Sequence, residues 1–345
     1  MILSETSPRR LNYRFLPSLN LLSMISIVIP LFNEQNSLEE LSQKIKETLE
    51  KSNLGGFEVL FVDDGSTDQS WGVVQQICEA DGRFKGLRFR RNFGKAAGLS
   101  AGFLQAKGRY VITMDADLQD DPAEIPRLIE KLESGFDCVS GWKQTRYDPW
   151  HKRYPSLVFN GILRRATKLD LHDFNCGLKA YRREALNEID LYGEMHRFIP
   201  VLVSTRGYRV AELAVQHHPR VHGVSKYGVE RILKGFLDLF TVVFLTRFRY
   251  RPQHLLGGIG FMACGVAGAL LTILCALWVL SRTLEGWTPI DLHERPIFYL
   301  TIILFIAGLQ FLSTGLLAEL VVANANRRLP AYSIRDTINT NDEDL

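Results

Sequence analysis

Closely spaced acidic residues near the middle of the chain have the types and spacing needed to bind a metal ion. The segment MDADLQDD (114–121) follows an apolar run, and Asp115 and Asp117 flank one small residue. In an extended chain, residues two apart face the same side, so we expect both carboxylates and the Gln119 amide to face one way. Such oxygen ligands suit a hard cation and leave positions for water and phosphate oxygens. The pattern predicts a Mg²⁺ or Mn²⁺ site at Asp115, Asp117 and Gln119, and a solvated acidic turn is the alternative.

Two further polar clusters follow apolar runs earlier in the chain, in IVIPLFNE (27–34) and FVDDGSTD (61–68). Their candidate ligand-binding residues are Pro30, Asn33, Glu34, Asp63 and Asp64. Carboxylates here can accept hydrogen bonds from a base N–H or a ribose hydroxyl, and Gly65 permits close backbone approach. The chain has no P-loop and no G-x-G-x-x-G motif, which argues against a standard ATPase or dinucleotide fold.

Alternating strands and helices must position these clusters. We expect strands at 25–30, 57–64, 86–90, 110–117 and 137–142, and helices at 37–52, 70–79, 95–106 and 122–135. This rhythm predicts an α/β fold with a doubly wound, mostly parallel sheet. Ligands of such sheets bind beyond the carboxyl ends of the strands, so the three polar clusters should converge on one crevice. Ser37 and Glu40 predict a capping box, and Gly135 is predicted to end the last helix.

Two long uncharged runs near the carboxyl end, 255–280 and 297–318, predict transmembrane helices. Each exceeds the roughly 20 residues needed to cross a bilayer, and a pair of buried core helices is the alternative. Arginines before the first run and after the second predict cytoplasmic termini and a short external loop. Residues 229–248 carry apolar side chains at helical spacing with interspersed cations, which predicts helices at the membrane interface; an ordinary packing helix is the alternative.

Composition narrows the class of protein. The chain has 345 residues, of which 46% are hydrophobic and 23% charged, and this excludes a disordered or collagen-like chain. The net charge of 41 − 38 = +3 is too small to indicate a nucleic-acid partner. The five cysteines form no C-x-x-C pair, so they predict neither a zinc site nor a disulfide framework, and a reducing compartment is expected.

Several motifs together resemble glycosyltransferase family 2, and more closely its polyprenyl-phosphate glycosyltransferases. The resemblance covers roughly residues 24–325, and its motifs are PLFNE (30–34), VDDGSTD (62–68), RNFGKAAGLSAG (91–102), DADLQD (115–120), DFNCGLKAYRRE (173–184) and HGVSKYG (222–228). It implies a GT-A fold and an inverting transfer of sugar from a nucleotide-sugar to a lipid phosphate.

The resemblance also implies roles for single residues. Donor contacts would come from Pro30, Asn33, Glu34, Asp63, Asp64, Lys95 and Asp115. Asp115, Asp117 and Gln119 would hold the metal on the diphosphate, and Asp173 would lie near the sugar. Asp115, Asp117 and Asp173 are therefore the predicted catalytic residues. Lys143 stands where the family often has an arginine.

A phosphate acceptor is already anionic near neutral pH, because its second pKa is about 6. We therefore expect cations to position it, with no dedicated catalytic base. The predicted lipid-phosphate contacts are Lys143, Arg146, Lys152, Arg153, Ser156, Arg220, Ser225 and Lys226. Histidines 217, 218 and 222 lack the spacing of a zinc helix.

The expected reaction is transfer from UDP-glucose to undecaprenyl phosphate at the cytoplasmic face of a bacterial membrane, with mannose or aminoarabinose derivatives as open alternatives. A processive polysaccharide synthase is the second candidate, but the chain has no Arg-Trp pair. A non-catalytic membrane scaffold is the third. Gln310 and Glu319 lie in or near the second apolar run and favour helix contacts in a homo-oligomer.

These expectations divide the chain into five parts: a flexible extension at 1–23, a cytoplasmic GT-A catalytic domain at 24–228, interfacial amphipathic helices at 229–250, a two-helix transmembrane domain at 251–325 and a flexible tail at 326–345.

Overall fold

The computed structural model contains two compact units, which we describe separately. It describes residues 24–52, 54–144, 160–165, 167–191, 193, 195–218, 241, 244, 251–284 and 287–325. Of these residues, the first unit contains those within 1–154, 171–204 and 208–226, and the second contains those within 155–170, 205–207 and 227–345. The predicted interfacial helices at 229–250 lie almost entirely outside the described residues.

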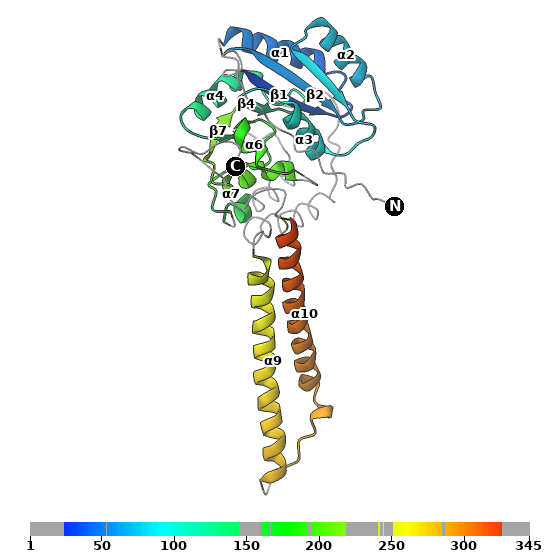
Figure 1. Cartoon of the computed structure of the whole chain (residues 1–345), viewed down its shortest axis with the longest axis vertical. Helices are drawn as coiled ribbons and strands as arrows, with labels where there is room; N and C mark the ends of the chain where they lie inside the picture. Colours follow the sequence, from blue (N-terminus) through cyan, green and yellow to red (C-terminus); the bar gives the residue numbers. More distant parts are fainter. Residues whose placement is uncertain are drawn as a thin grey trace, which may run out of the picture. The chain divides into compact units, whose positions relative to one another are not determined.

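The first unit is built on a seven-stranded sheet with the order β3-β2-β1-β4-β6-β5-β7 (Figure 1). The strands are β1 (Ile25–Leu31), β2 (Phe57–Asp63), β3 (Phe84–Arg88), β4 (Tyr110–Thr113), β5 (Cys138–Lys143), β6 (Lys179–Arg182) and β7 (Val210–Val215). Neighbours pair in parallel except that β6 runs antiparallel to both β4 and β5. The expected mostly parallel sheet is confirmed, with one reversed strand.

Helices cover both faces of this sheet, which confirms the doubly wound arrangement (Figure 1). On one face, α1 (Leu38–Lys51), α2 (Ser70–Ala80) and α4 (Ile125–Glu133) bury apolar residues against alternate side chains of β1 and β2. On the other, α3 (Lys95–Gln105), α6 (Arg183–Asn187) and α7 (Ile199–Thr205) bury theirs against the remaining side chains. The short 3-10 helices η2 (Pro122–Glu124) and η3 (Met195–Phe198) precede α4 and α7.

Three local predictions are wrong. The strand expected at 110–117 ends at Thr113, because the next residues fold back on themselves and Leu118 adopts a positive φ of 61°. The strand expected at 86–90 begins earlier, at Phe84. No capping box forms at α1, because the Ser37 hydroxyl donates to the Glu34 carbonyl instead. Gly135 does follow α4 with a φ of 102°, as expected of a helix-ending glycine.

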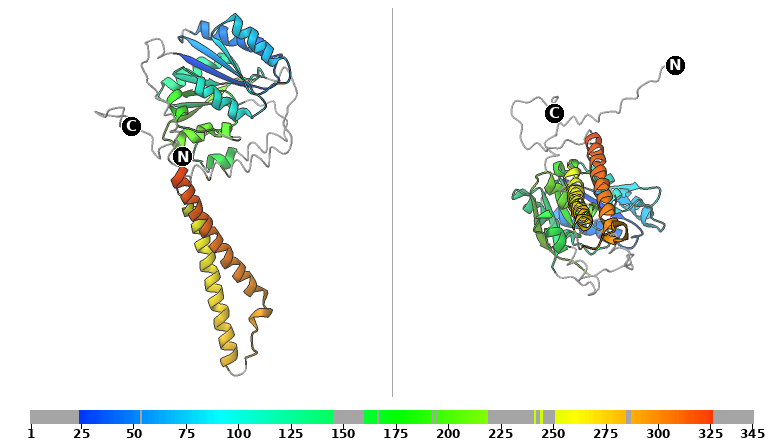
Figure 2. Two further views of the ribbon diagram at one scale, coloured as in Figure 1. Left: turned by 45° about the vertical axis from the view of Figure 1, so that its right-hand side comes forward. Right: turned by 90° about the horizontal axis from the view of Figure 1, so that it is seen from below.

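The second unit contains two long apolar helices that run side by side (Figure 1 and Figure 2). They are α9 (Pro252–Thr283) and α10 (Pro296–Ala325), and the 3-10 helix η4 (Leu292–Glu294) lies between them. Both are long and apolar enough to cross a membrane. Their backbones approach closely where Gly260 meets Gly308, since a β-carbon added at Gly260 would lie 2.7 Å from the Gly308 carbonyl oxygen.

Candidate functional site

The three polar clusters lie at the ends of adjacent strands, because β1 stands between β2 and β4 in the sheet. Leu31 at the end of β1 pairs with Asp63 at the end of β2. On the other side of β1, Val28 pairs with Thr113, the last residue of β4. Because these strands are parallel, all three clusters leave the sheet at its carboxyl edge, as the sequence predicted.

Hydrogen bonds join the first two clusters into one loop pair. The Asn33 amide donates to the Ser66 hydroxyl at 2.9 Å, and the Thr67 amide donates back to the Asn33 side-chain oxygen at 2.8 Å. The Glu34 amide donates to the Ser70 hydroxyl at 2.9 Å. Asn33 adopts a positive φ of 55°, a conformation that asparagine tolerates better than most residues. Asn33 therefore joins the two loops, and its role toward the donor stays a prediction.

Asp63 and Asp64 differ in what they can offer a ligand. Asp63 is fully buried, and its Oδ1 accepts the Ser66 amide at 2.9 Å. Its Oδ2 lies 3.3 Å from the Arg88 Nε and accepts no hydrogen bond from any described residue. Both Asp64 oxygens are used, by the amides of Phe93 at 2.6 Å and Gly94 at 2.9 Å. Burial outweighs these bonds and raises the Asp64 pKa.

The Asp64 contacts place the start of α3 beside the third cluster. Lys95 is the first residue of α3, and its ammonium contacts Asp115 Oδ1. The Lys95 and Asp115 side chains keep 29% and 33% of their surface exposed, so both remain accessible to a ligand. A chain of contacts thus runs from Asp64 through the loop before α3 to Asp115.

The acidic loop 114–121 presents its residues differently from an extended strand. Asp117 is only 9% exposed, and its Oδ1 accepts the Gln119 amide at 3.2 Å. The Gln119 side chain donates to the His218 carbonyl oxygen at 3.4 Å. The prediction that Asp115, Asp117 and Gln119 face one way assumed an extended strand. The chain turns at Leu118 instead, so alternation along a strand does not apply to these three residues.

The two carboxylates nevertheless suit a cation that also binds phosphate. Mg²⁺ is commonly held by one or two carboxylates together with substrate phosphates and water. Among the residues that the structure describes, no group of three or more His, Cys, Asp or Glu side chains could hold a metal ion. As oxygen donors, Asp115 and Asp117 are the residues that would hold such a cation.

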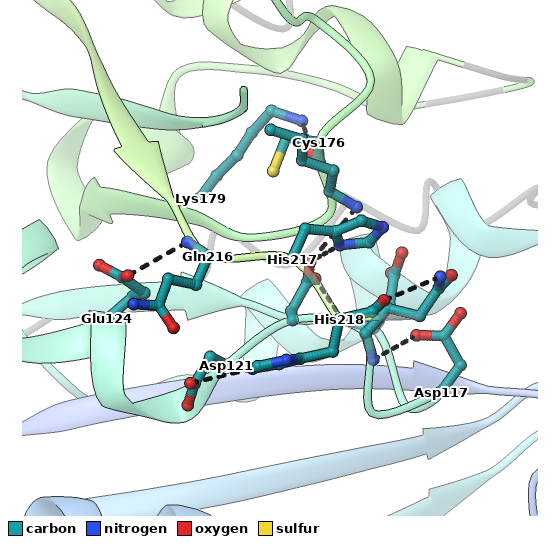
Figure 3. A network of polar contacts seen from close by, with 12 residues as sticks. Asp117, Asp121, Glu124, Cys176, Lys179, Gln216, His217 and His218 are labelled. Atoms are coloured by element: carbon teal, nitrogen blue, oxygen red, sulfur yellow. Dashed lines mark hydrogen bonds and ion pairs between the residues drawn. The ribbon is translucent and has the colours of Figure 1, made fainter. Parts of the chain in front are cut away.

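A buried charge cluster adjoins this loop, and it includes His217, which Figure 3 labels. Asp120 is 2% exposed, and its Oδ1 lies 3.3 Å from the Lys143 ammonium and 3.8 Å from the His217 Nδ1. Burial alone would raise the Asp120 pKa, but the charge of Lys143 and the His217 contact hold it well below its usual range. The sequence predicted Lys143 as a lipid-phosphate contact, and the structure places its ammonium against Asp120.

His218 also faces the acidic loop (Figure 3). Its Nε2 lies 3.2 Å from an Asp121 carboxylate oxygen, and its backbone amide donates to the Gln119 carbonyl oxygen at 2.9 Å. These contacts join the segment after β7 to the loop after β4. Asp120, Asp121 and His218 also line an open groove of about 520 Å³ that α1 bounds. Neither Lys95 nor Asp115 is among the residues that line this groove.

A second loop, residues 172–177, closes the site from the side of β5 and β7. Asp173 is 2% exposed, and its Oδ1 accepts the Asn175 amide at 3.0 Å. Gly177 packs against Asp115 so tightly that an added β-carbon would lie 2.5 Å from Asp115 Oδ2. The ammonium of the buried Lys179 donates to the Cys176 carbonyl oxygen. Burial lowers the Lys179 pKa.

Sequence reasoning missed Glu212, His172 and Trp142, which hold this loop. Glu212 lies on β7 and accepts hydrogen bonds from His172 and Asp173. Trp142 on β5 stacks on the His172 ring with a centroid distance of 4.3 Å. A glutamate within the largely apolar stretch VAELAV was the only available signal. Seven predicted lipid-phosphate contacts fall outside the described residues: Arg146, Lys152, Arg153, Ser156, Arg220, Ser225 and Lys226.

Comparison with known proteins finds a matching family and relatives of the same kind. The family described as glycosyl transferase family 2 matches residues 26–190. A dodecaprenyl-phosphate galacturonate synthase of Rhizobium johnstonii is 36% identical over 318 residues, which cover 90% of this chain and 92% of that protein. An undecaprenyl-phosphate 4-deoxy-4-formamido-L-arabinose transferase of Edwardsiella ictaluri is 36% identical over 329 residues, which cover 94% of this chain and 97% of that protein.

Among solved structures, glucosyl-3-phosphoglycerate synthase from Mycobacterium tuberculosis shares the fold. Its complex with Mn²⁺, UDP and phosphoglyceric acid superposes with a TM-score of 0.50 at 19% identity and covers 65% of this chain and 78% of that one. At this identity the likeness concerns the fold alone, and it agrees with the sheet and helix layers described above.

Proposed function

The chain belongs to glycosyltransferase family 2, among its polyprenyl-phosphate sugar transferases, and from this premise we propose the reaction in detail. A nucleotide-sugar binds at the carboxyl edge of β2, β1 and β4, and its sugar passes with inversion to the phosphate of a polyprenyl lipid. The observation that carries the proposal is that Asp63, Asp115 and Asp117 follow adjacent strands at one edge of the sheet, where Lys95 at the start of α3 contacts Asp115.

Each of these side chains suits one part of such a donor. The buried Asp63 Oδ2 lies 3.3 Å from the Arg88 Nε and accepts no hydrogen bond from the described residues, and we assign it to the N–H of a nucleobase. Lys95 is positioned to contact the diphosphate, since its ammonium already lies at Asp115. Asp115 and Asp117 would hold the divalent cation. When bound, this Mg²⁺ or Mn²⁺ stabilises the negative charge on the departing nucleoside diphosphate.

The acceptor needs little activation by the protein. A phosphate monoester is already anionic at neutral pH, since its second pKa is about 6. Asp173 is buried and its Oδ1 is used by the Asn175 amide, which suits an anchor of the loop near the sugar better than a general base. The eight predicted lipid-phosphate contacts remain part of this proposal, and Lys143 would reach the acceptor only by leaving Asp120.

The names of the relatives favour other sugars than the glucose expected from the sequence. Two aligned relatives are named for galacturonate and for 4-deoxy-4-formamido-L-arabinose. We therefore propose one of these two sugars, carried as a UDP derivative, with undecaprenyl or dodecaprenyl phosphate as the acceptor. Both α9 and α10 span the membrane in this proposal, with the catalytic unit and both termini in the cytoplasm, and the protein assembles as a homo-oligomer.

A donor panel tests the reaction. The full-length protein, in vesicles containing undecaprenyl phosphate and Mg²⁺, is given labelled UDP-galacturonate, UDP-4-deoxy-4-formamido-L-arabinose, UDP-glucose and GDP-mannose in separate reactions. We expect label in the lipid phase with one of the first two donors and one sugar per lipid by mass spectrometry. Label entering the lipid fastest from UDP-glucose would overturn the proposed sugar. Lipid-linked chains of several sugars would indicate a processive polysaccharide synthase. If no donor labels the lipid with either Mg²⁺ or Mn²⁺, the proposed reaction is wrong and the non-catalytic scaffold is favoured.

A further inference from the structure

Glu212 makes an unusual set of contacts for a residue on an edge strand. Its Oε1 accepts the backbone amides of His172 at 2.8 Å and Asp173 at 2.9 Å. Its Oε2 lies 2.8 Å from the His172 Nδ1, and the Glu212 side chain is only 9% exposed. One carboxylate thus satisfies three donors of two consecutive residues. Because buried carboxylates are costly unless they are hydrogen-bonded, this side chain has one strongly preferred position.

The two residues that Glu212 holds begin the loop that supports Asp115. Asp173 Oδ1 accepts the Asn175 amide at 3.0 Å, which fixes the turn that follows. The Gly177 carbonyl oxygen then accepts the Thr113 hydroxyl at 2.8 Å. The Gly177 α-carbon faces the Asp115 carboxylate so closely that no β-carbon fits between them. The loop therefore connects Glu212 on β7 to Asp115 after β4.

The ring of His172 adds a second attachment for the same loop. It stacks on Trp142 of β5 at 4.3 Å between centroids, with an interplanar angle of 18°. With Nδ1 directed at Glu212, rotation of the ring about its side-chain bonds is restricted. Trp142, His172 and Glu212 thus attach the loop to two strands by three different kinds of contact: stacking, a side-chain hydrogen bond and backbone hydrogen bonds.

We propose that Glu212 is a positioning residue for sugar transfer, which holds loop 172–177 so that Gly177 keeps Asp115 in its reactive position. Glu212 acts through the positions of its hydrogen-bonding oxygens and not through its negative charge. Its kinetic consequence rests on the proposed function, whereas its structural consequence does not.

Substitutions at Glu212 separate geometry from charge. Glu212→Gln keeps an oxygen for the two backbone amides, and its NH₂ group can donate to Nδ1 of the other His172 tautomer. Glu212→Asp keeps the charge but is one methylene shorter and cannot reach all three donors. We expect the Gln variant to stay within about 3-fold of the wild-type kcat, and the Asp variant to lose about 10- to 100-fold with little change in donor KM. Glu130→Gln, on an exposed position of α4, is the matched control.

Hydrogen exchange of the full-length protein without substrate supplies a readout independent of turnover. In Glu212→Asp, and in Glu212→Ala where it folds, we expect faster exchange in peptides covering 172–177 and also 113–117. Glu212→Gln and Glu130→Gln should match the wild type in both. Faster exchange at 172–173 alone would overturn the proposal, and so would a Gln variant that is as impaired as the Asp variant. If the wild type transfers no sugar, the proposed function fails while the exchange result still decides this inference.

Discussion

At the scale of single residues, the candidate site depends on charges that hold one another in place. The Lys143 side chain is 16% exposed and the Asp120 side chain 1%. Burial would lower the Lys143 pKa, but the Asp120 carboxylate outweighs it and raises that pKa above its usual value. The same pair lowers the Asp120 pKa. Both groups are therefore charged at neutral pH, and each depends on the other.

Removing either Lys143 or Asp120 should therefore destabilise the fold. We expect Lys143→Met to lower the free energy of unfolding by about 3–5 kcal/mol, because a buried carboxylate is left uncompensated. In that variant the Asp120 pKa rises, so Asp120 contributes stability below its unfolded-state pKa and loses it as the pH rises. The deficit relative to the wild type should thus shrink in acid. Denaturant unfolding at several pH values measures this, with Lys44→Met in an exposed Glu40 pair as control. Equal stability of Lys143→Met and Lys44→Met would contradict it.

A single added methyl group tests the position of Asp115. In Gly177→Ala the new β-carbon would meet Asp115 Oδ2 at 2.5 Å and Cγ at 2.6 Å, so the carboxylate has to move. We expect kcat to fall by about 10- to 100-fold, since small misplacements of reacting groups are costly. Steady-state transfer rates measure the change. Gly56→Ala is the control, because nothing lies within 4 Å of its β-carbon. Wild-type kcat in Gly177→Ala would show that the position of Asp115 is not limiting.

At the scale of elements, the two edges of the sheet differ in function. The carboxyl edge carries the candidate site, whereas Glu58 near the start of β2 stabilises the amino edge through hydrogen bonds. Glu58 is 2% exposed and accepts the Ser26 hydroxyl at 2.7 Å, the Lys85 ammonium at 2.5 Å and the Lys107 amide at 2.7 Å. Burial would raise the Glu58 pKa, but these hydrogen bonds together lower it.

Glu58→Gln should affect stability without affecting turnover per folded molecule. Because the Glu58 pKa is lowered by folding, its stabilisation is present above its ordinary pKa of 4.5 and is lost as the pH falls through the folded value. We expect the variant to lose about 1–3 kcal/mol at neutral pH, and less in acid. Unfolding curves across this range and transfer rates at neutral pH check both parts. A stability difference that grows in acid would contradict the assignment.

The packing of α9 against α10 can be tested in the same way. A β-carbon at Gly260 would lie 2.7 Å from the Gly308 carbonyl oxygen and 2.9 Å from the Leu312 amide nitrogen, whereas nothing lies within 4 Å of one at Gly268. We expect Gly260→Val to destabilise the helix pair by about 1–3 kcal/mol, as overpacking does. Gly268→Val should be close to neutral. Thermal unfolding in detergent measures both, and equal midpoints would show that the helices do not pack through Gly260.

At the scale of the whole molecule, the sequence predicted most of what depends on local pattern. The apolar runs gave β1 and β2 within one residue at each end, and the uncharged runs gave both long helices. The carboxyl-edge rule then placed the three polar clusters together. The features that the sequence could not predict depend on contacts between segments that are distant along the chain. The reversed strand β6, the Asp120–Lys143 pair and the Glu212 contacts join residues between 23 and 72 positions apart.

The acidic loop shows where such reasoning fails physically. Alternation along a strand was the basis for directing Asp115, Asp117 and Gln119 to one side, but the strand ends at Thr113. The turn at Leu118 and the bond from the Gln119 amide to Asp117 replace it. Asp115 and Asp117 stay the proposed ligands of the cation, and this turn now sets their positions.

The central claim is that a divalent cation at Asp115 and Asp117 enables sugar transfer to a polyprenyl phosphate. The most direct measurement is the initial rate of label transfer to lipid against free Mg²⁺ or Mn²⁺ concentration, for the wild type and for Asp117→Asn, which keeps the side-chain oxygen bound to the Gln119 amide. We predict no transfer in excess chelator, recovery on adding the cation, and a loss of about 100-fold or more in kcat for Asp117→Asn. A wild-type rate unchanged by chelator, or an Asp117→Asn variant with the wild-type rate and cation dependence, would contradict the account.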